Sequence, residues 1–209
     1  MFIWNLTKSG SFTVRSFYLN SLSEHPPFRH KMIWKLKIPL KIKIFLWYLQ
    51  RGVVLTKNNL VKKNWKGSKK CCGCNLDETN RHHFLECHYA RMVWRIIHIA
   101  TGLSPPRSIS HMFGNWLSNQ SKEIRNLIWV GVAVFCWAIW WCRNDIVFDK
   151  IKINSILQVI FSGAYWLRFW AQLQRNNQVK NTLSMMSKKI EIVALEQIKG
   201  GWNHNLRLL

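Results

Sequence analysis

Residues 71–87 read Cys-Cys-Gly-Cys-Asn-Leu-Asp-Glu-Thr-Asn-Arg-His-His-Phe-Leu-Glu-Cys and decide how the rest of the chain is interpreted. Counted from Cys71, the pattern is Cys-x2-Cys-x7-His-x4-Cys, which supplies three thiolates and one imidazole. Zinc favours such soft S and N ligands in a tetrahedral shell. Cys71 and Cys74 are the preferred first pair, because a Cys-x2-Cys turn, eased here by Gly73, is the usual chelating geometry. The spacing from Cys72 to Cys74 is too short for that turn.

The fourth ligand is either His82 or His83. In an α-helix that begins near Arg81, His83 and Cys87 lie four residues apart and share a face. His82 and Cys87 are five apart, which requires a bend before Cys87. Spacing alone slightly favours His83, and both histidines remain candidates. Because four protein ligands leave no open position for water, we expect a structural zinc ion and not a hydrolytic one.

The charge of the chain is strongly unbalanced, since 31 Lys+Arg against 9 Asp+Glu give a net charge of +22. Residues 1–70 hold 15 basic residues and one acid, a net of +14, whereas residues 71–100 are neutral. So basic a chain is expected to bind polyanions, meaning nucleic acid or an anionic membrane surface. The shortage of carboxylates leaves few residues for the acidic clusters of nucleases and polymerases, so an enzyme is the least favoured class.

The first residues indicate the cellular compartment. Residues 1–5 lack the basic region followed by an apolar stretch that begins a secretory signal. Six Cys in an unsecreted chain favour metal binding or free thiols over a disulfide framework. We therefore expect a nuclear or cytoplasmic protein that is not secreted.

Hydrophobic periodicity predicts a mainly α-helical fold. A small zinc-stabilised helical domain is expected in residues 1–100 and a linker with some helical content in 101–122. A helical region with one highly apolar helix follows in 123–175, and a tail of uncertain order in 176–209. The polar start of that tail gives way to a weakly amphipathic stretch near its end.

Two segments before the cysteines have local signals of their own. Lys alternates with apolar residues through residues 33–47, which by itself indicates a strand. Pro39 interrupts the alternation and suits the first turn of a helix, so a helix from residue 40 to about 52 is preferred. Thr56 is a candidate cap for a short helix in residues 57–63.

An uncharged run of 16 residues, 127–142, stands out in the second half of the chain. A helix that spans a membrane needs about 20 apolar residues, so this run falls just short, and Arg125 and Arg143 lie close to its ends. A helix that is apolar on all sides is usually the buried centre of a bundle. We therefore prefer a buried helix to a membrane span. Helices are also expected in residues 89–100, ended by Gly102, and in 153–174.

Several anchors accompany the Cys/His segment: Trp4, Gly10-Ser11-Phe12-Thr13-Val14-Arg15-Ser16-Phe17-Tyr18, Ile33-Trp34-Lys35, Pro39-Leu40-Lys41, Phe45-Leu46-Trp47, Leu55-Thr56, Leu60 and Trp94. In this order they resemble the zinc-binding domain of plant reverse transcriptases from LINE-type (non-LTR) retrotransposons, over roughly residues 1–95. The family pattern places two residues between Glu-Thr and the histidine ligand. The resemblance therefore implies that His82 is the ligand, with Cys71, Cys74 and Cys87, and that His83 takes an apolar position.

A later segment, Ala138-Ile139-Trp140-Trp141-Cys142-Arg143-Asn144-Asp145-Ile146-Val147-Phe148, is similar to one that often follows this domain in the same elements. In many relatives an RNase H domain comes next. Here residues 150–209 hold only two acids, Glu191 and Glu196, and the chain has no Asp-Asp polymerase motif. The resemblance thus implies a non-catalytic piece of a retrotransposon polyprotein, whose parent would be an RNA-directed DNA polymerase.

The expected function is binding of RNA or DNA by a module with Zn2+ as its structural cofactor. Trp65 lies between basic residues and is a better candidate for base stacking than Trp47, which has the surroundings of a core residue. The alternatives are a decayed retroelement fragment without selected function and a membrane-associated protein held by residues 127–142. The candidate phosphate-binding residues are Lys35, Lys37, Lys41, Lys43, Lys57, Lys62, Lys63, Lys66, Lys69 and Lys70.

Overall fold

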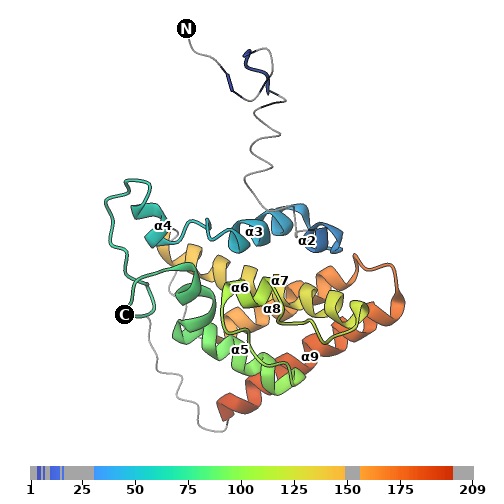
Figure 1. Ribbon diagram of the computed structural model, residues 1–209. Helices are drawn as coiled ribbons and strands as arrows, with labels where there is room; N and C mark the ends of the chain where they lie inside the picture. Colours follow the sequence, from blue (N-terminus) through green and yellow to red (C-terminus); the bar gives the residue numbers. More distant parts are fainter. Residues whose placement is uncertain are drawn as a thin grey trace. The chain divides into compact units, whose positions relative to one another are not determined.

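The structure is a computed structural model (Figure 1) that describes positions 4, 5, 7, 10–14 and 16 and residues 31–148 and 156–199. The chain has two compact units, Met1–Lys35 and Leu36–Leu209. In the first unit, α2 spans Lys31–Lys35. Near the start of the chain, a turn is closed by a hydrogen bond from the Trp4 amide to the Gly10 carbonyl (2.8 Å).

The second unit is helical, which confirms the mainly helical fold expected from the sequence. Its elements are α3 (Leu40–Gln50), α4 (Lys57–Val61), the π-helical turn η1 (His82–Glu86), α5 (His88–Thr101), α6 (Ile109–Phe113), α7 (Lys122–Val147), α8 (Ile156–Ala171) and α9 (Asn177–Lys199). The described residues contain no strand, only an isolated antiparallel bridge between Lys70 and Asp77.

The Lys-rich alternation before the cysteines forms helix α3, so its interpretation as a strand is wrong. Pro39 precedes the first helical residue, and Gly52, with φ +71°, follows the last turn. The buried residues recur at helical spacing: Ile42, Phe45, Leu46 and Leu49. The spacing of three to four between the apolar residues therefore decides the structure, and the alternation of the lysines does not. The reason is that burial of apolar surface contributes more free energy than the placement of exposed lysines.

Helix α7 lies at the centre of the unit and contacts α3, η1, α5, α8 and α9. Ser121 caps its start by accepting a hydrogen bond from the Ile124 amide (3.3 Å). Among the described helices, α7 alone is long and apolar enough to cross a membrane, and half of its most apolar stretch is buried by the rest of the unit. This burial supports the interpretation of α7 as a core helix.

Residues 177–199, whose order was open from the sequence, form helix α9 against α8. The buried positions of α9 lie mostly three or four residues apart: Leu183, Ser187, Ile190, Val193 and Ala194. The Ser187 hydroxyl donates to the Ala164 carbonyl (2.9 Å), and Arg168 of α8 forms an ion pair with Glu191 (2.7 Å). This narrow stripe of buried residues is therefore enough to pack α9 against α8, although the sequence of α9 is mostly polar.

The expected linker is packed against the bundle. Gly102 ends α5 in the left-handed conformation (φ +74°), as predicted. In the segment that follows, Trp116 donates to the Ser104 carbonyl (2.9 Å) and its ring meets the edge of Trp94 (5.9 Å). The unit from Leu36 onward thus includes both the cysteine segment and the long helices, and the division expected between them stays a prediction.

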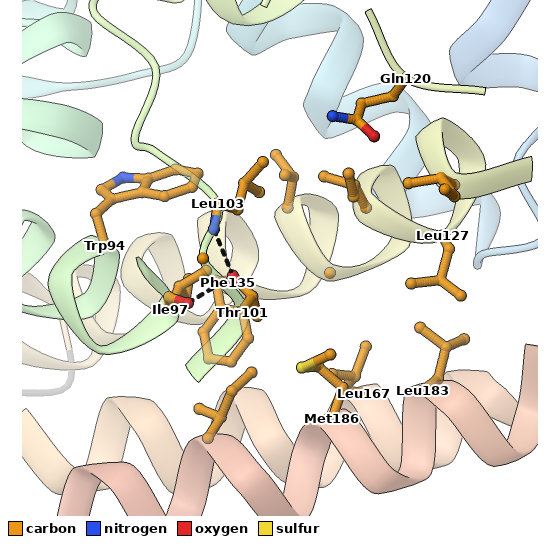
Figure 2. A pocket seen from close by; sticks show the side chains of 16 residues that line it. Trp94, Ile97, Thr101, Leu103, Gln120, Leu127, Phe135, Leu167, Leu183 and Met186 are labelled. Atoms are coloured by element: carbon orange, nitrogen blue, oxygen red, sulfur yellow. Dashed lines mark hydrogen bonds between the residues drawn. The ribbon is translucent and has the colours of Figure 1, made fainter. Parts of the chain in front are cut away.

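An apolar cavity of about 320 Å³ lies between α5, α7, α8 and α9. Figure 2 shows Trp94 at one side, with Phe135 of α7 and Leu183 and Met186 of α9 around the space. Gly131 also lines it, and a Cβ placed there would meet no atom within 4 Å. The bundle therefore has room beside α7 that a larger side chain could fill.

Candidate metal centre

Four side chains from one short segment converge at one point: Cys71, Cys74, His82 and Cys87. All their ligand atoms lie within 4.8 Å of one another. The sulfurs of Cys71 and Cys87 are 3.8 Å apart, and the Cys74 sulfur lies 3.1 Å from His82 Nε2. Two sulfurs bound at about 2.3 Å to a tetrahedral zinc are about 3.8 Å apart. The donor set and its spacing therefore fit zinc.

The first two cysteines lie on a turn that backbone hydrogen bonds hold closed. The Cys71 amide donates to the Leu76 carbonyl (2.8 Å), and the Glu78 amide donates to the Lys69 carbonyl (2.8 Å). Within the turn, the Gly73 amide donates to the Cys71 sulfur (3.4 Å). Such N–H donors stabilise the thiolate, which is the metal-binding form of cysteine.

A π-helical turn, η1, explains why His82 joins the group although it lies five residues before Cys87. The Cys87 amide donates to the His82 carbonyl (2.6 Å), so the hydrogen bond reaches back five residues instead of four. Residues five apart thereby come to one face. Thr79 fixes the start of the turn, since its hydroxyl accepts from the His82 amide (3.0 Å). The assumption of an α-helix, which favoured His83, is therefore wrong.

His83 is buried outside the four-residue group. Its ring meets the edges of Phe84 (centroids 4.7 Å apart) and of Trp140 on α7 (5.8 Å). Its Nε2 is buried without a hydrogen-bond partner among the described residues. Burial lowers the pKa of His83 to about 3, so its imidazole is neutral and fills an apolar position.

The thiols of the centre influence one another. Cys71 shares hydrogen bonds with Cys72 and Cys87, and these hydrogen bonds lower the pKa of Cys71. The same hydrogen bonds raise the pKa values of Cys72 and Cys87. A lowered pKa favours the thiolate, which is the metal-binding form of cysteine.

A buried ion pair connects the metal centre to α7, and sequence reasoning did not find it. Glu78 and Arg143 are 0% and 2% exposed. Arg143 donates through Nε (3.0 Å) and Nη2 (2.7 Å) to Glu78 Oε1. The same oxygen accepts from the Lys57 amide (2.8 Å), so Glu78 caps α4. Thr56, the predicted cap, makes no cap hydrogen bond in the described part of the chain.

The guanidinium of Arg143 is also enclosed by aromatic rings. Its Cζ lies 5.1 Å from the Trp140 ring and 5.6 Å from the Phe148 ring. The sequence contained signals for both partners, because Glu78 belongs to the cysteine segment and Arg143 to the later similar segment. Nothing in the spacing shows that two residues 65 positions apart are paired.

The predicted phosphate-binding lysines lie in separate places. Lys35 is exposed in the first unit. Three others lie on or just before α3, and the remainder lie on α4 and the segment that follows it: Lys37, Lys41, Lys43, Lys57, Lys62, Lys63, Lys66, Lys69 and Lys70. Lys43 and Lys57 are half-buried and the others are exposed.

Some of these lysines have anionic or aromatic neighbours. Lys69 and Lys70 form ion pairs with Asp77 (2.9 and 3.1 Å), and their hydrogen bonds lower the pKa of that carboxyl. Lys41 lies over the rings of Trp137 (5.6 Å) and Trp141 (5.9 Å) on α7. Among the predicted lysines after α4, Lys62, Lys63 and Lys66 thus remain the clearest exposed cations.

The two candidate stacking residues differ in their surroundings. Trp65 is 39% exposed, and its ring covers Gly67 so closely that a Cβ there would lie 2.1 Å from it. Trp47 is half-buried beneath the Arg51 guanidinium, 4.9 Å from the ring centroid. Trp65 therefore offers more of its ring to a partner.

Comparison with known proteins finds similarity in the part of the chain that holds this geometry. Residues 12–94 match the family described as zinc-binding in reverse transcriptase, and that range contains all four converging side chains. The chain is also similar to a putative ribonuclease H protein of Arabidopsis thaliana, with 23% identity over 148 residues. The match covers 66% of this chain but only 23% of the Arabidopsis protein. No solved structure matches the chain. These similarities relate the chain to a zinc-binding domain of retroelements.

Proposed function

We propose that this chain is a non-catalytic, zinc-stabilised module that binds nucleic acid, related to the reverse transcriptase polyprotein of plant LINE-type retrotransposons. One observation carries the proposal: Cys71, Cys74, His82 and Cys87 converge within 4.8 Å inside the part similar to reverse-transcriptase zinc-binding domains. The shortage of carboxylates supports a non-catalytic role. The proposal places the protein in the nucleus or cytoplasm, where thiols stay reduced.

The zinc ion would be structural, because four side chains complete its tetrahedral shell. When bound, it cross-links the cysteine turn to η1 and to the start of α5. Cys71, with its lowered pKa, supplies thiolate, and His82 supplies Nε2. Thr79 and the π-helical hydrogen bond hold the imidazole on the same side as Cys87.

Metal analysis of two serine variants tests the ligand set. Cys74→Ser removes a member of the group, whereas Cys72→Ser changes a thiol of similar half-exposure that is two residues away. We expect about one zinc per chain in the wild type and in Cys72→Ser, and loss of zinc from Cys74→Ser. Equal zinc content in both variants, or a wild type whose cysteine segment folds without metal, contradicts the proposal.

Nucleic-acid binding is proposed for the exposed lysines after α4. Lys62 and Lys63 are adjacent and exposed, and Lys188 and Lys189 form a comparable exposed pair on α9. Each lost phosphate contact lowers the slope of log K against log[salt] by about 0.9 for duplex DNA and about 0.7 for single strands. We therefore expect a smaller slope for Lys62→Gln/Lys63→Gln and little change for Lys188→Gln/Lys189→Gln.

Titration of RNA and DNA oligonucleotides across a salt series checks this expectation. A slope near zero for the wild type would exclude phosphate contacts altogether. Equal reductions from the two lysine pairs would mean that only the overall charge matters, and the assignment of the surface to residues after α4 would then be wrong.

A further inference from the structure

A continuous group of aromatic rings lies on α7 and α8, outside the metal centre. We call it the aromatic face, and its members are Trp137, Trp141, Tyr165, Trp166 and Phe169. Ring centroids are 6.0 Å apart between Trp137 and Trp141 and 6.4 Å between Trp141 and Trp166. Trp166 in turn lies 5.3 Å from Tyr165 and 5.9 Å from Phe169. The rings thus form one connected surface across two helices.

Much of this face is open to solvent. Trp141, Tyr165 and Phe169 are 43%, 55% and 53% exposed. The bundle is built from the other side of α8, where the buried residues are Ile156, Val159, Ile160, Gly163, Ala164, Leu167, Trp170 and Ala171. Single apolar residues are common on protein surfaces. Contiguous exposed apolar patches are rarer and commonly mark an interaction site.

A cation lies directly over two of the rings, while the carboxylate of Asp145 lies in the hollow beside Trp141 and Trp166. Lys41 of α3 lies over the rings of Trp137 and Trp141. Lys37, four residues earlier in the chain, is exposed. On α8, Arg168 is paired with Glu191. A second copy of the chain is a poor partner, because two molecules that each carry +22 repel one another.

Beside the rings is a small hollow of about 220 Å³, which Trp141 and Trp166 line together with polar residues. Asp145, Gln158 and Ser162 supply hydrogen-bond donors and acceptors there. Aromatic faces next to mixed polar groups are the chemistry that recognises nucleobases, whose faces stack and whose edges form hydrogen bonds.

We propose that the aromatic face binds single-stranded nucleic acid, with bases stacked on Trp141, Tyr165 and Phe169 and a phosphate near Lys41. The inference rests on the proposed function, because it assumes the same class of partner, but it assigns a separate surface and a preference for unpaired strands. Bases in a duplex are stacked on one another, so they are closed to exposed rings. An unpaired strand presents its bases freely.

The test uses the full-length, zinc-loaded chain with oligo-dT and with the matching dT·dA duplex, measured by fluorescence anisotropy. Tyr165→Ala/Phe169→Ala removes two exposed rings, and Met185→Ala/Ile192→Ala removes two exposed apolar side chains of α9 as a matched control. We expect affinity for the single strand to fall about tenfold or more in the aromatic variant. Duplex affinity and the salt slope stay unchanged, because no charge is lost, and the control variant behaves as the wild type.

Three results would overturn the inference. The first is an unchanged single-strand affinity in the aromatic variant, and the second is an equal loss for single strand and duplex. The third is a wild-type dimer in sedimentation that the aromatic variant converts to monomer, because the face would then be a contact between copies. Failure of the proposed function is distinguishable, since a wild type that binds neither oligonucleotide fails both, whereas an unaffected aromatic variant fails only this inference.

Discussion

The metal centre and the long helices reach stability by different means. Helix α7 buries ten residues, of which Arg143 alone is charged, and it is covered by its neighbouring helices. In contrast, α4 buries no residue, and several of the buried groups around the cysteines are polar: Thr56, Glu78, His82 and His83. The helices are held by apolar packing, whereas the cysteine segment buries few apolar side chains, chiefly Phe84 and Leu85, and depends in addition on specific bonds.

The two regions are therefore sensitive to different kinds of change. Specific bonds between few atoms fail together when one partner is removed, whereas apolar packing weakens by degrees with each lost contact. The Glu78–Arg143 ion pair is the point at which the two regions are joined. Four changes, to the metal or to single residues, should affect the two regions differently, and the change in unfolding free energy should decrease from the first to the last.

Removal of zinc is expected to unfold the cysteine segment while the long helices persist. Structural zinc contributes an apparent free energy of about 10–16 kcal/mol in small zinc domains. After treatment with a chelator, hydrogen exchange should accelerate in α4 and η1 and remain slow in α7 and α8. Continued protection of η1 in a metal-free sample would contradict the distinction between the two regions.

Loss of the arginine at the junction comes next. Arg143→Met leaves the fully buried Glu78 carboxylate without its counter-charge, which costs about 3–5 kcal/mol in comparable buried pairs. Urea unfolding of the zinc-loaded protein measures the change. Glu78→Gln combined with Arg143→Met should restore part of the stability, and strictly additive losses would show that the pair is not coupled.

Added bulk in the packed helices has a smaller effect. A Cβ at Gly163 of α8 would lie 2.4 Å from the Phe135 ring of α7. We therefore expect Gly163→Ala to destabilise the bundle by about 1–3 kcal/mol in thermal unfolding. The zinc content should stay at the wild-type value, and its loss would mean that the two regions are more tightly coupled than proposed.

The smallest expected effect has the opposite sign. Gly131→Ala places a methyl group in open space beside the apolar cavity of Figure 2 and improves helix propensity in α7. We expect stabilisation of about 0.5–1 kcal/mol. Gly163→Ala is the matched control, since both changes replace a helical glycine by alanine and differ in the space available. A loss of stability in Gly131→Ala would contradict the expectation that the open space beside this residue can hold a methyl group.

The sequence predicted the features that depend on local chemistry. Pro39 and Gly102 mark the boundaries of α3 and α5, and the uncharged run 127–142 gives the long apolar helix. Cys71, Cys74 and Cys87, which the spacing selected, converge with His82, and Cys72 forms a second group with Cys71 and Glu78. Each of these signals lies within a few residues of its effect, so it can be read without knowledge of the fold.

What the sequence did not reveal depends on non-local geometry. A π-helical turn differs from an α-helix by one hydrogen-bond step, and no residue type in 82–86 marks that choice. Glu78 caps α4 from 21 residues away, in place of the adjacent Thr56. The Glu78–Arg143 pair requires that α7 already lie against the cysteine turn, which is a property of the assembled fold.

The separation of that pair along the chain has a consequence for synthesis. All four candidate zinc ligands lie within residues 71–87. Arg143, however, lies 65 residues after Glu78. Gln174, which donates to the Lys37 carbonyl, lies 137 residues after Lys37. On the ribosome, the metal site is complete before α7 exists, since proteins are made from the N-terminus. If the chain binds zinc as proposed, the nascent chain can bind it first. The later helices then assemble onto a segment that is already formed, and Arg143 pairs with Glu78 last.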